Sequence, residues 1–172
     1  MERNAKDDSK DAVEMLKEQH REVETLFKTF EELGENAAKR KQATFEKIAD
    51  ALAMHATIEE KHFYPAVKAK RTEDILLEAL EEHLGIKRVI ADLLKIDSSD
   101  ETFDAKVKVL KEQVEHHVEE EESDLFPKVK KVLGKPELTA IAATMQETMK
   151  RLMAKGDARK AVPGETREAA AL

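Results

Sequence analysis

The sequence contains no cysteine and no tryptophan, and its 172 residues include only five glycines and four prolines. The lack of cysteine excludes disulfides, iron–sulfur clusters, thiolate zinc sites and cysteine nucleophiles. Any metal ion in the protein must therefore be held by histidine and carboxylate side chains. Scarce glycine and proline, combined with abundant alanine, glutamate, lysine and leucine, are typical of an all-α bundle of helices.

Long apolar runs are also missing. No stretch approaches the roughly 20 consecutive apolar residues that a membrane-spanning helix needs, and the first ten residues have no apolar core for a signal peptide. The net charge of −7 is spread in mixed sign along the chain, without the concentrated basic face that binds nucleic acid. We therefore expect a cytoplasmic protein of one domain's length, with neither nucleic acid nor a membrane as its partner.

Apolar residues recur at alternating steps of three and four along four long segments, which is the pattern of amphipathic helices. These segments cover residues 9–33, 35–70, 72–96 and 100–133. Their short connections favour an up-down-up-down antiparallel four-helix bundle over residues 1–134. Residues 135–155 are expected to form an additional C-terminal helix that packs on the bundle or on a second copy, giving a homo-oligomer, and residues 156–172 a flexible tail.

One motif occurs twice along the chain. A histidine, three intervening residues, two glutamates and a later aromatic–proline pair run from His55 to Pro65 and again from His117 to Pro127, an offset of 62. Two single histidines, His20 and His83, are offset by 63. The chain is therefore a pseudo-repeat of two helix pairs, whose matching halves are expected to face each other across the bundle axis.

Six polar residues occupy positions where a bundle core needs leucine or valine: His20, His55, Glu59, His83, His117 and Glu121. Burying such groups unpaired would cost on the order of several kcal/mol. A divalent metal compensates them directly, because imidazole nitrogen and carboxylate oxygen suit iron, manganese and zinc. Two His-x-x-x-Glu pairs and one histidine from each remaining helix form a cage with room for two ions.

The doubled motif, alternating with single-histidine helices, resembles the hemerythrin-like HHE cation-binding domain. The resemblance covers about residues 13–133 and implies a non-haem di-iron centre, with two Fe ions bridged by oxo or hydroxo. It makes the four histidines terminal ligands and the two glutamates bridges: His20, His55, His83, His117, Glu59 and Glu121. Zinc or manganese are alternative occupants of the same donor set.

The sequence departs from the oxygen-carrying hemerythrins of invertebrates in its third helix. Those proteins have a second histidine four residues after the first, where this chain has Lys87. One metal is then less saturated by the protein, which favours sensing or small-ligand chemistry over reversible oxygen transport. Glu24, one turn after His20, is a candidate additional ligand, but its repeat counterpart is Lys87, and a charge at the bundle rim is the alternative.

Other residues near the motif receive supporting roles. Glu60 and Glu122 recur in both copies and are expected to orient ligand imidazoles from outside the centre. We expect His62 to be solvated, with a role beside the site as the alternative, and His116 to lie on the surface. Tyr64, the only tyrosine, aligns with a phenylalanine in the second copy and is expected to pack in the core.

Counting donor atoms leaves about one open position on each metal for a small ligand such as O2, peroxide or water, which a purely structural site would not need. The leading hypothesis is a non-haem di-iron protein that binds or senses O2, a related small oxidant or iron, without committed turnover. A second is a di-iron oxidase or peroxide-consuming enzyme, although the sequence reveals neither a substrate pocket nor a catalytic residue. A third is a structural or storage module holding zinc or mixed metals.

Overall fold

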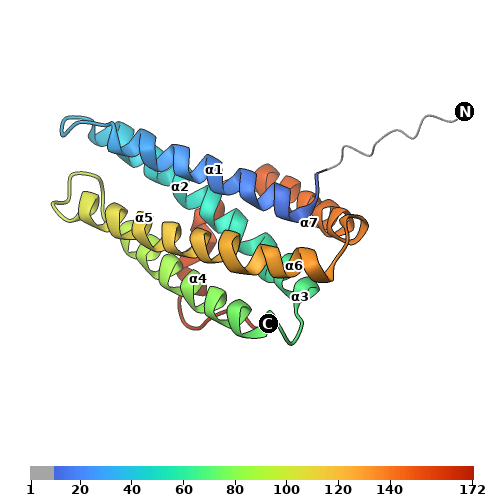
Figure 1. The fold of residues 1–172 in the computed structure, drawn as a ribbon. Coiled ribbons are helices and arrows are strands. Elements are labelled where there is room, and N and C mark those ends of the chain that lie inside the picture. Colours follow the sequence, from blue (N-terminus) through green and yellow to red (C-terminus); the bar gives the residue numbers. More distant parts are fainter. Residues whose placement is uncertain (1–9) are drawn as a thin grey trace, which may run out of the picture.

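The computed structural model describes residues 10–172, so the first nine residues of the predicted bundle domain lie outside the described part. Every regular element within residues 10–172 is a helix, which confirms the all-α prediction. The bundle consists of four long helices, α1 (Ala12–Glu31), α2 (Ala38–Ile58), α4 (Glu73–Leu93) and α5 (Phe103–Glu120). Figure 1 shows these helices lying side by side with alternating chain direction, and the additional helix α7 (Lys135–Lys155) at one end of the bundle.

Two apolar clusters make up the core, and a polar layer separates them. The first contains Leu16 of α1 together with Phe63 and Leu76, and the second contains Phe27 of α1 together with residues such as Phe45. In each of the four long helices the histidine of interest lies between residues of the first cluster and residues of the second. Apolar packing therefore fixes the helices on both sides of this layer, which is where rigid positioning is needed.

Both copies of the motif interrupt their helix with a π-helical segment. These segments are η1 (Glu59–Phe63) and η2 (Glu121–Leu125), followed by the short helices α3 (Tyr64–Val67) and α6 (Phe126–Val132). The residue after each segment donates its N–H to the carbonyl five positions back, which belongs to the motif's first glutamate. Such π turns are rare and occur frequently at functional sites.

The prolines of the motif explain why the wider turn forms there. Pro65 and Pro127 each follow the π segment by two residues. In a regular α-helix a proline lacks the N–H of one hydrogen bond and its ring collides with the carbonyl four residues before it. The wider turn moves that carbonyl, so the helix continues past the proline instead of ending.

Helix α7 packs on the bundle, where Leu138, Ala142 and Met145 join the first apolar cluster. After it, Gly156 and Asp157 adopt positive φ angles of 71° and 49° and turn the chain back along the bundle. Gly156 accepts a positive φ at no steric cost because it lacks a Cβ atom, and Asp157 is of a type that tolerates the left-handed conformation. Figure 1 shows the last segment returning beside α2 and α4.

The structure differs from the expectation of a flexible tail over residues 156–172. Residues Ala158–Glu165 form the 3₁₀ helix η3, which lies across α2 and α4. Val162 is 1% exposed in the second apolar cluster, and Arg159 forms ion pairs with Asp50 (2.7 Å) and Glu46 (3.2 Å) of α2. Individual anchors hold this segment, so it shows no helical periodicity in the sequence. None of the helices in the described part is both long and apolar enough to cross a membrane.

Candidate metal centre

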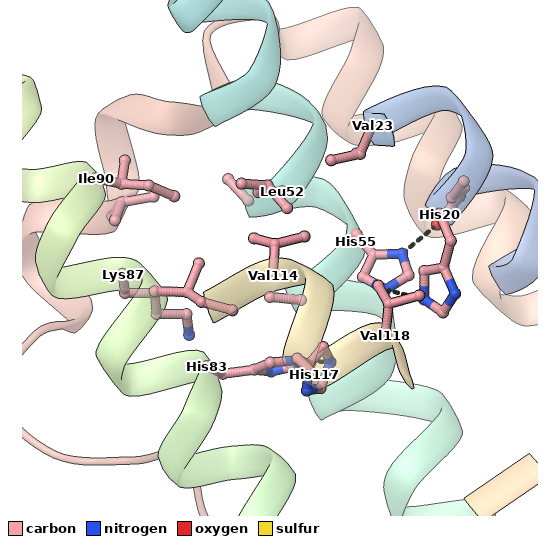
Figure 2. Close-up of a pocket in the computed structure, with 15 residues that line it drawn as sticks. His20, Val23, Leu52, His55, His83, Lys87, Ile90, Val114, His117 and Val118 are labelled. Carbon is pink, nitrogen blue, oxygen red and sulfur yellow. Dashed lines mark hydrogen bonds between the residues drawn. The ribbon is translucent and has the colours of Figure 1, made fainter. Parts of the chain in front are cut away.

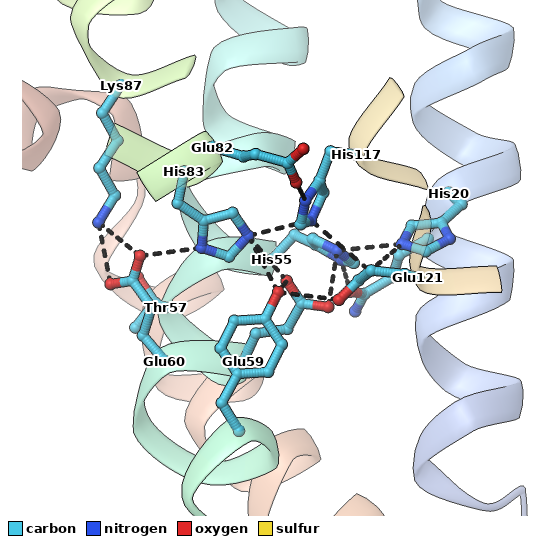
Figure 3. A network of polar contacts seen from close by, with 12 residues as sticks. His20, His55, Thr57, Glu59, Glu60, Glu82, His83, Lys87, His117 and Glu121 are labelled. Carbon is cyan, nitrogen blue, oxygen red and sulfur yellow. Dashed lines mark hydrogen bonds and ion pairs between the residues drawn. The ribbon is translucent and has the colours of Figure 1, made fainter. Parts of the chain in front are cut away.

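The structure brings all six predicted metal-binding residues together in the polar layer (Figure 3), and none of these residues is more than 6% exposed. Their ligand atoms form two overlapping groups, within each of which all atoms lie within 4.8 Å of one another. The first group is His20, His55, Glu59 and Glu121; the second is Glu59, His83 and His117. Glu59 belongs to both groups, so its carboxylate is available to each of them.

In the first group, the imidazoles of α1 and α2 face each other. The Nε2 atoms of His20 and His55 are 3.2 Å apart. Oε1 of Glu59 lies 3.2 Å from His55 Nε2, and Oε2 of Glu121 lies 3.3 Å from His20 Nε2. Two nitrogens and two carboxylate oxygens thus surround one point.

The second group repeats this arrangement between α4 and α5. The Nε2 atoms of His83 and His117 are 3.1 Å apart. The other oxygen of Glu59, Oε2, lies 3.2 Å from His83 Nε2, and Oε2 of Glu121 lies 3.6 Å from His117 Nε2. Each glutamate therefore stands between a histidine of one half and a histidine of the other.

Each imidazole is oriented from behind by an acceptor on its Nδ1 atom. In two cases the acceptor is the second glutamate of the motif, reaching across to the other half: Glu122 to His20 (2.8 Å) and Glu60 to His83 (3.0 Å). This agrees with the supporting role predicted for both glutamates. An ionised carboxylate only accepts, so Nδ1 must donate, and this fixes the ring orientation.

The other two acceptors escaped the sequence analysis. His55 Nδ1 donates to the side-chain oxygen of Gln19 at 2.8 Å, and His117 Nδ1 donates to Glu82 Oε2 at 2.7 Å. Gln19 and Glu82 immediately precede His20 and His83 in the sequence, so they share the offset of 63. The repeat could have revealed these acceptors, because polar residues at matching positions beside the two ligand histidines indicate that they have the same role.

This protonation pattern tests whether the residues fit a metal. Because Nδ1 carries the proton in each ring, Nε2 of a neutral imidazole presents a lone pair, and four such lone pairs converge with two carboxylates. Among residues 10–172, Oε1 of Glu59 and Oε2 of Glu121 are buried without a hydrogen-bond partner. Buried acceptors that face other acceptors need cations between them, and this donor set suits divalent metals.

Without a metal, protons compensate part of this charge. Burial alone would lower the pKa of His83, but its hydrogen bonds to Glu59 and Glu60 outweigh that effect and raise the pKa to about 9. Burial alone would raise the pKa of Glu59, but the charges and hydrogen bonds of His55 and His83 hold it well below its usual value. Metal ions and protons therefore compete for the same imidazoles.

Tyr64 does more than pack in the core, which corrects the expectation for this residue. It is fully buried, its ring stacks on His83, and its hydroxyl donates to Glu121 Oε1 at 2.8 Å and to Glu59 Oε2 at 3.3 Å. Burial and the charges of the two glutamates raise the pKa of Tyr64 well above its ordinary value. The hydroxyl therefore keeps its proton and holds it at the bridging carboxylates.

The remaining candidates lie outside the two ligand groups. The side chain of Glu24 is 62% exposed and pairs with Arg21 at the rim, as the alternative interpretation had it. His62 forms a hydrogen bond of 2.8 Å with the Thr148 hydroxyl of α7. It therefore connects η1 of the bundle to α7 and is not simply solvated. His116 is exposed, as predicted.

Two spaces lie beside the centre. A cavity of about 30 Å³ lies directly beside the four histidines (Figure 2), and its walls include Val23, Leu52, Ile90, Val114 and Val162. A larger cleft of about 500 Å³ reaches His20 from the surface, and charged residues of α1 and α5 line it. The surface of the cavity is almost entirely apolar, whereas the cleft has both charged and apolar side chains in its walls.

Residues 11–129 match the model of the hemerythrin HHE cation binding domain. The chain belongs to this family. The match includes both motif copies and all six residues of the centre, so the resemblance predicted from the motif is confirmed and cation binding is a property of the family.

A solved structure and a curated protein are also similar to this HHE domain. The crystal structure of a hemerythrin HHE cation binding domain-containing protein from Mycobacterium kansasii has a TM-score of 0.75 and 25% identity, covering 92% of this chain and 95% of that one. A DNA nickase from Nostoc sp. is 29% identical over 121 residues, which is 70% of this chain. The match spans only 34% of the nickase.

Proposed function

We propose that this HHE domain is a non-haem di-iron protein that binds or senses O2, a related small oxidant or iron. The observation that carries the proposal is the pair of overlapping histidine–glutamate groups that share Glu59, with a carboxylate oxygen directed at each group. Two cations fit such a cage, because bridging carboxylates offset the repulsion between them. Two iron ions would supply exchangeable electrons and open coordination positions for a small ligand.

The residues around the centre support a small ligand rather than a large substrate. The cavity of about 30 Å³ exceeds the space that one water molecule needs, and its apolar walls suit a molecule of a few atoms. Lys87, which stands where the oxygen carriers have a further histidine, is engaged elsewhere. Its ammonium group binds both oxygens of Glu60 (2.8 and 2.9 Å) and Glu165 (2.9 Å), so it supplies no ligand.

A di-iron enzyme that consumes peroxide or oxidises a small substrate is the second candidate, and Tyr64 favours it. Its hydroxyl is a proton donor 2.8 Å from the bridging Glu121 and is shielded from solvent. Reactions of small oxidants develop negative charge, and a buried phenol that keeps its proton can stabilise this charge by donating a hydrogen bond. The cleft at His20 would admit the reactant.

The test of the leading proposal is elemental analysis combined with spectroscopy of iron-loaded protein. We expect about two irons per chain after dialysis against a weak chelator, and near-ultraviolet absorption that changes on reduction or on addition of azide. His117→Ala should lose iron and this absorption, whereas His62→Ala, a matched change outside the centre, should keep both. A featureless spectrum with fewer than about two irons would overturn the proposal.

A peroxide assay separates the two candidates. Steady loss of hydrogen peroxide that disappears in His117→Ala and slows in Tyr64→Phe favours the enzyme. Tyr64→Phe keeps the aromatic ring and removes only the hydroxyl, and phenylalanine is already the counterpart in the second motif copy. A spectral response to peroxide without turnover favours binding or sensing.

A further inference from the structure

A second group of potential ligands lies on the surface of α4 and α5, outside the buried centre. Nε2 of His116 is 3.3 Å from Oε1 of Glu82 and 3.3 Å from Oε1 of Glu120. The three ligand atoms lie within 4.8 Å of one another. His116 is 61% exposed, Glu120 35% and Glu82 16%, so the group is open to solvent on one side.

The charges in this group are not balanced by the protein. Two carboxylates, those of Glu82 and Glu120, share the one imidazole of His116. No lysine or arginine in the part of the chain that the structure describes forms an ion pair with Glu82 or Glu120. Oε1 of Glu82 is buried without a hydrogen-bond partner among these residues, and it is directed at His116. A bound cation would satisfy this carboxylate oxygen together with the exposed imidazole beside it.

The internal repeat shows that the fold does not require this group. The positions that correspond to Glu82, His116 and Glu120 in the first half are Gln19, Met54 and Ile58. Gln19 still orients its histidine, so the orienting role needs only an oxygen and not a charge. The carboxylate of Glu82 and the two neighbouring ligands are therefore additional features of the second half.

We propose that Glu82, His116 and Glu120 form an outer site for one divalent first-row cation such as Zn²⁺. His116 and Glu120 are four residues apart on one face of α5, and Glu82 completes the site from α4. One imidazole and two carboxylates are suitable ligands for such ions, and three protein ligands leave a position for water. The site exchanges readily with solvent because it is exposed.

Glu82 also connects the outer site to the buried centre. Its Oε2 accepts the hydrogen bond from His117 Nδ1 at 2.7 Å, while its Oε1 is a ligand atom of the outer group. A cation on Oε1 withdraws negative charge from the carboxylate and weakens this hydrogen bond. The Nε2 atom of His117 then donates its electron pair less strongly to a metal in the buried centre. The two sites are then coupled, and the coupling is reciprocal. This coupling rests on the proposed function, whereas binding at the outer site does not.

Saturation with Zn²⁺ tests the outer site without any need for iron. Wild type and His116→Gln are titrated with Zn²⁺ by calorimetry, and the bound metal is counted after gel filtration. We expect the wild type to hold one more Zn²⁺ per chain than His116→Gln. Glu120→Gln should bind that additional ion at least about tenfold more weakly than the wild type does. Glu119→Gln, an exposed neighbour with the same change of charge, should match the wild type. Equal stoichiometry and affinity in the wild type and His116→Gln would overturn the proposal.

Spectroscopy of the iron-loaded protein tests the coupling. Added Zn²⁺ should shift the near-ultraviolet absorption of the wild type and leave that of His116→Gln unchanged. An unchanged wild-type spectrum, with the extra Zn²⁺ bound, would refute the coupling and retain the site. A wild type that fails to hold about two irons before Zn²⁺ is added would instead contradict the proposed function, so the two failures are distinguishable.

Discussion

The two halves of the pseudo-repeat are nearly identical inside and different outside. Inside, each half contributes a pair of facing histidines and one glutamate at the same distances to within a few tenths of an ångström. Outside, the groove between α1 and α5 is an open cleft at His20, whereas η3 covers the equivalent side between α2 and α4 at His83. Internal symmetry thus produces two similar ligand groups, and external asymmetry determines from which side these groups can be reached.

The series of polar contacts behind His83 and behind His20 show the same contrast between a covered side and an open side. His83 is held by Glu60, Glu60 by Lys87 and Lys87 by Glu165 of the C-terminal segment, as Figure 3 shows for the first three. The Lys87 side chain is only 9% exposed. On the other side, His20 is held by Glu122 and Glu122 by Arg21, whose side chain is 55% exposed at the cleft. We therefore expect exchange with solvent at the His20 side.

The largest effect is expected where the two halves share a residue. Glu59→Ala removes the carboxylate common to both ligand groups and leaves the remaining imidazoles without a bridge. We expect loss of both metal ions, measured as metal per chain after dialysis. Glu119→Gln serves as the control because it changes charge outside the centre. Retention of one full equivalent would show that the halves bind independently.

The next largest effect should come from removing the positively charged side chain behind His83 or behind His20, which should distinguish the covered side from the open side. Lys87→Met leaves Glu60 buried beside His83 without its partner, which should lower the free energy of unfolding by about 3 kcal/mol. Arg21→Met on the open side should cost less than about 1 kcal/mol, because solvent screens that pair. Urea unfolding of both variants measures the difference. Equal losses would contradict the contrast between a covered side and an open side.

Deleting residues 157–172 should make the two sides more alike. Without Val162 and η3, the cavity beside the histidines opens between α2 and α4. We expect metal loss to EDTA about tenfold faster than in wild type, followed by absorbance, because a second route becomes available. Glu168→Gln, an exposed change in the same segment, should leave the rate unaltered. An unchanged rate in the deletion variant would mean that η3 does not control access.

The smallest effect concerns the pH dependence of the metal-free protein. The pKa of His83 is raised from 6.5 to about 9, so the folded state binds its proton more tightly than the unfolded state. The resulting stabilisation is complete below pH 6.5 and is lost as the pH rises through 9. Thermal unfolding should therefore show a decline in stability from pH 6.5 to 9, and His83→Gln should flatten it. No decline in wild type would mean that His83 is neutral without metal.

The buried histidines and glutamates could be predicted because helical periodicity and the repeat independently assigned them to the core. The role of Tyr64 could not, since a residue five positions after Glu59 points about 140° away from it on a regular α-helix. The π turn between them returns the tyrosine hydroxyl to within 3.3 Å of that glutamate. Likewise, the anchors of the C-terminal segment join residues such as Arg159 and Asp50, about a hundred positions apart, and leave no local pattern.

The order of η3 and the ligand residues along the chain has a consequence for biosynthesis. Ribosomes synthesise a protein from its N-terminal to its C-terminal residues, and all six residues of the centre precede the segment that covers one side of it. The four helices can therefore meet while the α2–α4 side still faces water. Val162 closes that side only after η3 has been synthesised. Any product that stops before η3 contains the full ligand set but leaves that side of the centre uncovered.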